Sequence, residues 1–311
     1  MTTHGEMPRV RWACAVATGG AAVSWELSSP GPLGPALATC AAFLLLAGYA
    51  LHLRQRLLGG EVPALHRGPL RPLPPRLDGL EVAARHTPGA GGDLYEAVAT
   101  AYGVRVVIGD ARGHGLPALG AAGAVLAAFR EAAHEEPAPA DVLRRMEAAL
   151  ARHLAAAGPE QQPAEEFVTV LLLQITAEGA VHALNCGHPW PYRLPAAPVP
   201  AGSCAGPAGP SPGPVQLRGE ALPPLGVLPL PARLEARVCD ELAPGESLFL
   251  YTDGVTEARD DSGAEFPLAP ALTGAALSVG PAGLVAAVHA ALLHHTGGEL
   301  LDDAALLALR R

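Results

Sequence analysis

The stretch VVIGDARGHGLPALG, residues 106–120, decides the fold. Its apolar run predicts a buried strand that ends in Asp110 and a glycine turn. The following pattern predicts a helix over 116–134. One stripe of this helix comprises Leu116, Leu119, Gly123, Leu126 and Phe129. A carboxylate at the end of a buried strand is either a turn residue or part of a polar site.

The preceding segment, GGDLYEAVATAYGVRVVIGD, supplies a partner for Asp110. Two strand-like runs join at Ala101–Tyr102, which predicts a β-hairpin in which the numbers of facing residues sum to about 203. Asp93 then faces Asp110 at the open end, and facing residues lie about 5 Å apart. Two carboxylates this close repel unless one keeps its proton or a cation bridges them.

The C-terminal part repeats this arrangement in SLFLYTDG and LDDAALLALR. If these strands are antiparallel neighbours, Asp253 and Asp302 also meet at one edge, with Asp303 beside them. Aspartate before glycine is ordinary turn chemistry when it occurs alone. Four such carboxylates predict a site for Mg²⁺ or Mn²⁺, which prefer oxygen ligands. The glycines that let the backbone come close there are Gly92, Gly109, Gly113 and Gly254.

Two histidines lie near these motifs. His114, in GHG, is a metal ligand, a general acid or a loop residue on this pattern. His188 follows Asn185 in NCGHPWPYRL, where a tight turn ends a strand. We expect a structural role for both histidines.

Composition limits the function classes. The chain has 311 residues and a formal net charge of −9, with no lysine-rich block, so we expect no nucleic-acid partner. Its five cysteines are scattered and form no CxxC pair. This pattern argues against a disulfide framework or a zinc site and favours small buried thiols in a reducing cytosol.

The N-terminal part, residues 1–56, reads as a membrane anchor. The uncharged run 35–53 is long enough to span a bilayer, and a weaker run covers 12–28. Arginines flank both runs on their outer sides, which predicts a transmembrane hairpin with the rest of the chain in the cytoplasm. A single span is the alternative, and the late start of the strong run disfavours a signal peptide.

The rest of the chain reads as one α+β domain, residues 80–311, after a Pro/Gly/Arg-rich linker, 57–79, and with a flexible loop at 195–216. Helical patterns cover 116–134, 139–156 and 281–296. Strand-like runs cover 80–86, 94–100, 104–109, 167–176, 180–186, 234–239, 247–252 and 304–310. This order suits helices packed on antiparallel sheets.

Together these motifs resemble a known family. GGDLYEAV, GDARGHG, FVTVLLLQI, LNCGHPWPYRL, LFLYTDGVTEARDDSG and LDDAALLALR occur in one order. The set is similar to the PPM-type metal-dependent phosphatases, the protein phosphatase 2C superfamily, in its bacterial stage II sporulation branch. The resemblance implies an α-β-β-α four-layer sandwich with two Mn²⁺ or Mg²⁺ ions. It also implies a phosphorylated regulatory protein as substrate, often of the anti-anti-sigma type.

The resemblance also assigns roles to residues. Asp93 and Asp110 match the bridging ligands, and the Ala111 carbonyl matches a backbone ligand. Asp253 and Asp302 match the later ligands, and Asp303 is the alternative because the doubled aspartate leaves the match ambiguous by one. Arg112 replaces a common serine, and its guanidinium either grips the phosphate or faces solvent.

The implied mechanism is direct attack on phosphoserine or phosphothreonine by water held between the two metals and activated by them. Two alternatives remain: a catalytically degenerate, membrane-anchored binding protein, and a phosphohydrolase acting on small molecules. We expect location at the cytoplasmic face of the inner membrane, and the sequence leaves a homodimer open.

Overall fold

The structure is a computed structural model that describes residues 70–87, 91–157, 166–196, 213–276, 280–300 and 302–311. Its strands form two antiparallel sheets. Sheet A has the order β1 (Arg76–Leu77), β2 (Leu80–Thr87), β11 (Ala304–Arg310), β10 (Ser247–Tyr251), β7 (Tyr192–Leu194), β8 (Val215–Gln216). Sheet B has the order β3 (Asp93–Thr100), β4 (Gly103–Ala111), β5 (Val168–Ile175), β6 (Ala180–Cys186), β9 (Arg237–Glu241).

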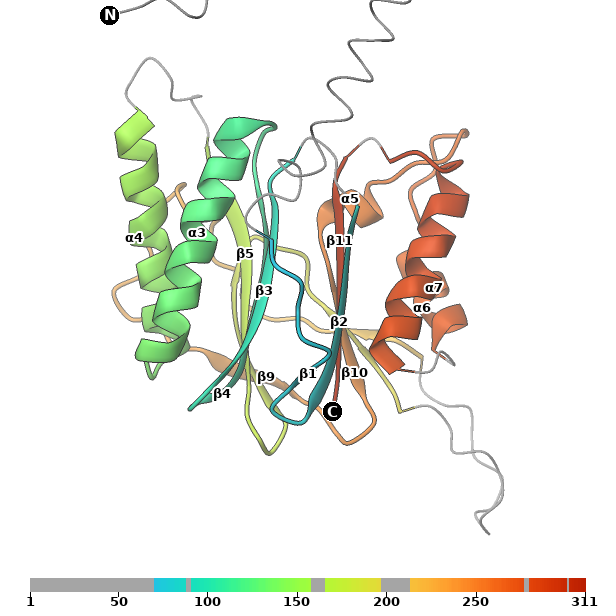
Figure 1. The fold of residues 1–311 in the computed structure, drawn as a ribbon, viewed down its shortest axis with the longest axis horizontal. Helices are drawn as coiled ribbons and strands as arrows, with labels where there is room; N and C mark the ends of the chain where they lie inside the picture. The colour runs from blue at the N-terminus through green and yellow to red at the C-terminus, as the bar shows by residue number, and fades with distance from the viewer. Residues whose placement is uncertain (1–69, 88–90, 158–165, 197–212, 277–279, 301) are drawn as a thin grey trace, which may run out of the picture. The chain divides into compact units, whose positions relative to one another are not determined.

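Helices cover the outer face of each sheet (Figure 1). Helices α3 (Leu116–Glu135) and α4 (Pro139–Ala157) pack on sheet B. On the other side, α7 (Gly280–His295) packs on sheet A and against α6 (Leu268–Ala275). A four-residue helix, α5 (Asp253–Thr256), follows β10. The expected α+β sandwich of two antiparallel sheets is therefore confirmed.

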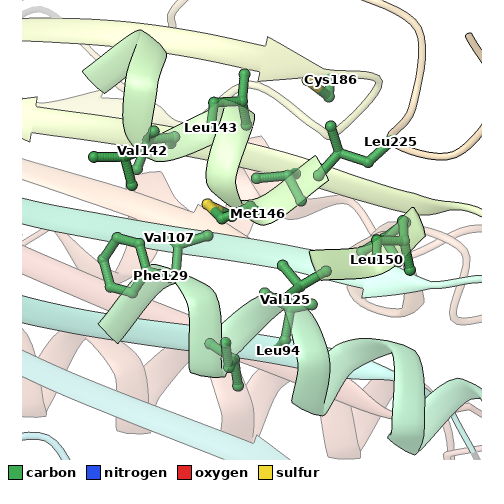
Figure 2. Close-up of a cluster of buried hydrophobic side chains, with 14 of the residues drawn as sticks. Leu94, Val107, Val125, Phe129, Val142, Leu143, Met146, Leu150, Cys186 and Leu225 are labelled. Atoms are coloured by element: carbon green, nitrogen blue, oxygen red, sulfur yellow. The ribbon is translucent and has the colours of Figure 1, made fainter. Parts of the chain in front are cut away.

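Three apolar clusters hold these four layers together. The cluster under α3 and α4 includes Val125, Phe129 and Met146 against Leu94 and Val107 of sheet B (Figure 2). A second cluster fills the space between the sheets with side chains from both of them. A third joins α6 and α7 to sheet A. Burial of apolar area in three layers is the main favourable term in folding here.

The predicted elements agree with the structure within a few residues, and the exceptions are short. The strand predicted at 234–239 begins three residues later, at Arg237. Strand β1 lies inside the predicted linker and β8 inside the predicted loop, where each pairs with a neighbouring strand. Such two-residue strands carry too little periodicity to be seen in sequence.

The predicted apolar stripe of α3 is wrong at its first residue. Leu116 is 72% exposed, because it precedes the part of the helix that reaches the sheet. Small residues make much of the contact face, so the backbone of α3 packs closely on the sheet. The buried residues of the helix are Ala118, Ala121, Ala122, Val125, Leu126, Phe129, Ala132 and Ala133.

Within the described part of the chain, α3 is the one helix whose length and hydropathy would suit a membrane span, and half of that window is buried in the protein. The predicted spans 12–28 and 35–53, and residues 57–69 of the predicted linker, lie outside the described residues. The same holds for residues 197–212 of the predicted loop.

Candidate metal centre

The site lies where the inward-facing stripes of five strands change from apolar to polar. Along β3 the stripe Ala97, Tyr95 continues to Asp93, and along β4 the stripe Val106, Ile108 continues to Asp110. Because side chains alternate across a strand, these carboxylates point to the same inner face as the core. The other inward stripes also become polar at this end: in β2 at His86, in β5 at Thr169, and at Asp303, which directly precedes β11 and lies two residues before Ala305.

The hairpin register is confirmed at every position. Asp93 pairs with Asp110, and the pairing runs without a shift to Thr100 and Gly103. Asp93 is only 4% exposed. Burial raises the pKa of Asp93 well above its usual value, and the charges of Asp303 and Asp110 raise it further. Burial and the neighbouring carboxylates also raise the pKa of Asp110 to about 7.

The C-terminal carboxylates meet this pair, as expected. Strands β10 and β11 are antiparallel neighbours, and Asp253 opens α5 directly after β10. Any Cβ on Gly254 would lie 2.1 Å from the Asp303 carbonyl oxygen, so the TDG and DDAA segments touch. The charges of Asp253, Asp302 and Asp303 all act on Asp110.

The two adjacent aspartates differ in environment. Asp302 is exposed, and partial burial together with Asp303 raises its pKa to about 6. Asp303 is buried, and its Oδ2 accepts a hydrogen bond from the Asp93 N–H at 2.9 Å. Burial acts to raise the pKa of Asp303, but its contacts with His86, Asp302 and the Asp93 N–H outweigh burial and lower it. Asp303 therefore braces the start of β3, and Asp302 stands at the rim.

Glycines permit this close approach. A Cβ on Gly92 would lie 2.6 Å from the Ala111 carbonyl oxygen, and one on Gly109 would lie 2.2 Å from the Thr169 carbonyl oxygen. Gly91, which the sequence reading did not single out, would place a Cβ 1.7 Å from Asp303 Oδ1. Both glycines of the GGD motif are therefore sterically required.

Two threonines, the buried Thr252 and the partly buried Thr169, hydrogen-bond to Asp93 and Asp110, and sequence reasoning missed both. Thr252 donates from Oγ1 to Asp93 Oδ2 at 2.9 Å and accepts the Ala305 N–H at 2.9 Å. Thr169 accepts the Asp110 N–H at 3.2 Å. The signal that could have found Thr169 and Thr252 is their place on the inward stripes of β5 and β10.

His188 packs beneath the site, as expected of a structural residue. The backbone N–H of His188 donates to Asn185 Oδ1, and the side-chain amide of Asn185 donates to the backbone carbonyl of His188, both at 2.8 Å. Its Nε2 lies 3.2 Å from the Tyr251 carbonyl oxygen and its Nδ1 lies 3.0 Å from Thr169 Oγ1. A carbonyl only accepts, so Nε2 carries the hydrogen and Nδ1 accepts from Thr169. These two hydrogen bonds of the His188 ring, which we call the His188 relay, join Thr169 of sheet B to Tyr251 of sheet A.

The remaining predicted residues lie on the exposed turn after β4. The Arg112 guanidinium stacks over the Phe167 ring, 5.1 Å from its centroid. His114 is exposed, and Gly113 has a φ of +102°, which favours glycine. Gly115, the N-cap of α3, has a φ of +76°. The turn thus carries the exposed Arg112 guanidinium between the end of β4 and the start of α3.

The residues present fit divalent metal ions. Five aspartates from both sheets act on one another electrostatically at one end of the sandwich. Their mutual repulsion and burial disfavour the charged forms, and bound cations would reverse this effect. A set made almost wholly of carboxylate oxygens, with the Ala111 carbonyl beside it, suits Mg²⁺ or Mn²⁺.

Comparison with known families agrees with this geometry. The family model for stage II sporulation protein E (SpoIIE) matches residues 100–311, more than half of the chain. The chain belongs to the SpoIIE family. The resemblance seen in the sequence is thereby confirmed, and the domain is of the PPM phosphatase type. The comparison with curated proteins finds no match.

Solved structures share the fold of this SpoIIE-family chain. The RsbU and RsbW domains of Rv1364c from Mycobacterium tuberculosis match with a TM-score of 0.58 and 21% identity, over 75% of this chain and 61% of that one. The SiaA-PP2C domain of Pseudomonas aeruginosa matches with a TM-score of 0.57 and 20% identity, over 88% and 98%. The PP2C phosphatase domain and a regulatory fragment of SpoIIE from Bacillus subtilis match with a TM-score of 0.53 and 13% identity, over 74% and 63%.

Proposed function

We propose that this protein is a metal-dependent phosphatase that removes phosphate from phosphoserine or phosphothreonine on a regulatory protein. The observation that carries the proposal is the convergence of Asp93, Asp110, Asp253 and Asp302 at one end of the sandwich. Membership of the SpoIIE family supports it.

In this proposal Asp93, Asp110, Asp253 and Asp302 would hold two Mn²⁺ or Mg²⁺ ions, and the Ala111 carbonyl would serve as a backbone ligand. Such ions lower the pKa of water and offset negative charge on phosphoryl oxygens. The protein contributes by holding its ligand residues in fixed positions. Thr252 and Asp303 each hold Asp93 with a hydrogen bond, so its carboxylate stays in place.

At the rim, Arg112 is the residue proposed to orient the phosphoryl group. A guanidinium offers paired N–H donors that match phosphate oxygens. Its side chain is exposed at the turn that follows Ala111, so a protein-borne phosphate has access to it. We take the substrate to be an anti-anti-sigma-type regulator, which the family resemblance favours.

Residues 12–28 and 35–53 are proposed to anchor the protein in the inner membrane. The arginine flanks and the uncharged run of the sequence support this proposal. The phosphatase domain would then lie on the cytoplasmic side, where phosphorylated regulators are found.

The test is release of phosphate from a phosphorylated anti-anti-sigma-type regulator by the full-length chain, with Mn²⁺ and with a chelator. We expect Asp110→Asn to lower the Mn²⁺-dependent rate at least about 100-fold. The exposed Asp261→Asn is the matched control and should keep the parental rate.

Three results would overturn the proposal. Parental activity of Asp110→Asn would show that the carboxylate cluster is not the active site. Hydrolysis of nucleotides but not of phosphoprotein would identify a small-molecule phosphohydrolase, and binding without any hydrolysis would identify a degenerate binding protein.

A further inference from the structure

His86 lies against the predicted metal centre although no motif includes it. It is the last inward-facing residue of β2, after Leu80, Val82 and Ala84, and it pairs with Ala305 of β11. The stripe before it belongs to the core between the sheets, so the imidazole stands where that core gives way to carboxylates. Its side chain is 12% exposed.

The Nε2 atom of His86 is buried and has no hydrogen-bond partner among the described residues. Two carboxylate oxygens lie near it, Asp303 Oδ2 at 3.8 Å and Asp93 Oδ2 at 4.0 Å, both too far for a hydrogen bond. Buried imidazole nitrogens are normally paired. The three atoms, one nitrogen and two carboxylate oxygens, lie within 4.8 Å of one another.

This spacing suits atoms that share an ion. Ligand bonds of about 2.0–2.2 Å place two ligand atoms of one ion about 3.0–3.5 Å apart. Shifts of under about 1 Å in the side chains would bring Nε2 and both oxygens to that spacing. Each oxygen already accepts one hydrogen bond, Asp93 Oδ2 from Thr252 and Asp303 Oδ2 from the Asp93 N–H. A carboxylate oxygen has a second lone pair for an ion.

We infer that His86 is a nitrogen ligand of the metal centre, acting from its inner side together with Asp93 and Asp303. The inference rests on the metal centre of the proposed function and adds to its oxygen ligands a donor of a different class. Mg²⁺ takes oxygen ligands, and Mn²⁺ shares that preference but, as a first-row transition metal, also accepts an imidazole nitrogen. His86 therefore favours Mn²⁺ over Mg²⁺ in this chain.

The experiment is electron spin-echo envelope modulation on the Mn²⁺-loaded full-length chain, which detects nitrogen bound to the ion. We expect a ¹⁴N coupling that is replaced by a ¹⁵N signal when the protein is grown with ¹⁵N-histidine. This measurement needs no substitution, so it does not depend on a variant that folds. The proposed oxygen ligands produce no such coupling.

Variants then show which residue supplies the coupled nitrogen. His86→Ala should lose the coupling and bind Mn²⁺ at least about 10-fold more weakly, with under about 3-fold change for Mg²⁺. His114→Ala, the matched control in the exposed GHG turn, should keep both. A metal-loaded protein without nitrogen coupling, or with coupling that persists in His86→Ala, overturns the inference. In either case phosphate release from phosphoprotein, measured separately, still decides the proposed function.

Discussion

Replacement of His188 tests the relay that joins the two sheets beneath the site. In His188→Ala the Tyr251 carbonyl loses its donor, and the Thr169 hydroxyl loses its closer acceptor and keeps only the Asp110 carbonyl oxygen at 3.4 Å. A buried polar group left without a partner costs about 1–3 kcal/mol, so the unpaired Tyr251 carbonyl lowers the free energy of unfolding by about that amount. Loss of the buried ring leaves a cavity that adds to this cost.

The assay is urea unfolding of the full-length chain, followed by circular dichroism. We expect His188→Gln to recover part of the loss, because its amide replaces one of the two ring contacts. The exposed His134→Ala is the control and should change stability by no more than about 0.5 kcal/mol. A loss below about 1 kcal/mol in His188→Ala would refute the relay.

The same residue gives a pH dependence. Burial lowers the pKa of His188 to about 3, well below the usual value of about 6.5 in an unfolded chain. As the pH falls from about 6.5 to about 3, the unfolded state therefore takes up a proton that the folded state does not. His188 thus makes stability fall across this window, by at most about 1.4 kcal/mol per pH unit.

The difference in unfolding free energy between the parent and His188→Gln isolates this effect, because the other titrating groups are common to both. We expect the stability advantage of the parent to shrink as the pH falls below about 6.5. A difference that stays constant from pH 7 to pH 3.5 would contradict a buried, neutral His188.

Three further predictions follow from the packing. Gly92→Ala should lose Mn²⁺ binding and destabilise the domain, because its Cβ would lie 2.6 Å from the Ala111 carbonyl oxygen. Gly274→Ala in α6, where the added Cβ meets open space, is the control and should stabilise the domain by up to about 1 kcal/mol. Calorimetry measures metal binding and stability for both variants. Arg105→Lys should lower the unfolding free energy by about 2–4 kcal/mol, since Arg105 is fully buried and bonds three carbonyls at the α3–α4 junction; urea unfolding with no loss would contradict this. Glu96→Gln should lower the free energy of unfolding by about 1–3 kcal/mol, because it weakens the 2.7 Å hydrogen bond from Arg130 of α3 to Glu96 of β3. Unchanged hydrogen exchange in α3 would contradict this.

The two cysteines within the described residues match the expected role of unreactive thiols. Cys186 is buried and Cys239 half-buried, and both are free. Burial raises the pKa of Cys186 to about 12 and that of Cys239 to about 11, so neither is a thiolate near neutral pH. Both thiols therefore act as small core side chains.

Local patterns were enough for much of this fold. The alternation of apolar residues and the glycine turns predicted the long strands and the three long helices, because period and turn chemistry are properties of neighbouring residues. Hairpin geometry is also local, and it placed Asp93 opposite Asp110 from the position of one turn.

What the sequence by itself determined about this protein is therefore the sandwich, the family and the pairing of Asp93 with Asp110. Only the tertiary structure decided which residues brace them. Thr169 of β5 and Thr252, directly after β10, hydrogen-bond to them, and His86 of β2 lies beside them. These three residues are far apart in the chain, and each is an ordinary residue in its own segment. They become site residues because the sheets stack face to face, so that the inner stripes of separate strands end at the same place. The buried face of α3 was also decided by the tertiary structure. Apolar periodicity places Leu116 on that face, but the packing of α3 on sheet B leaves Leu116 exposed.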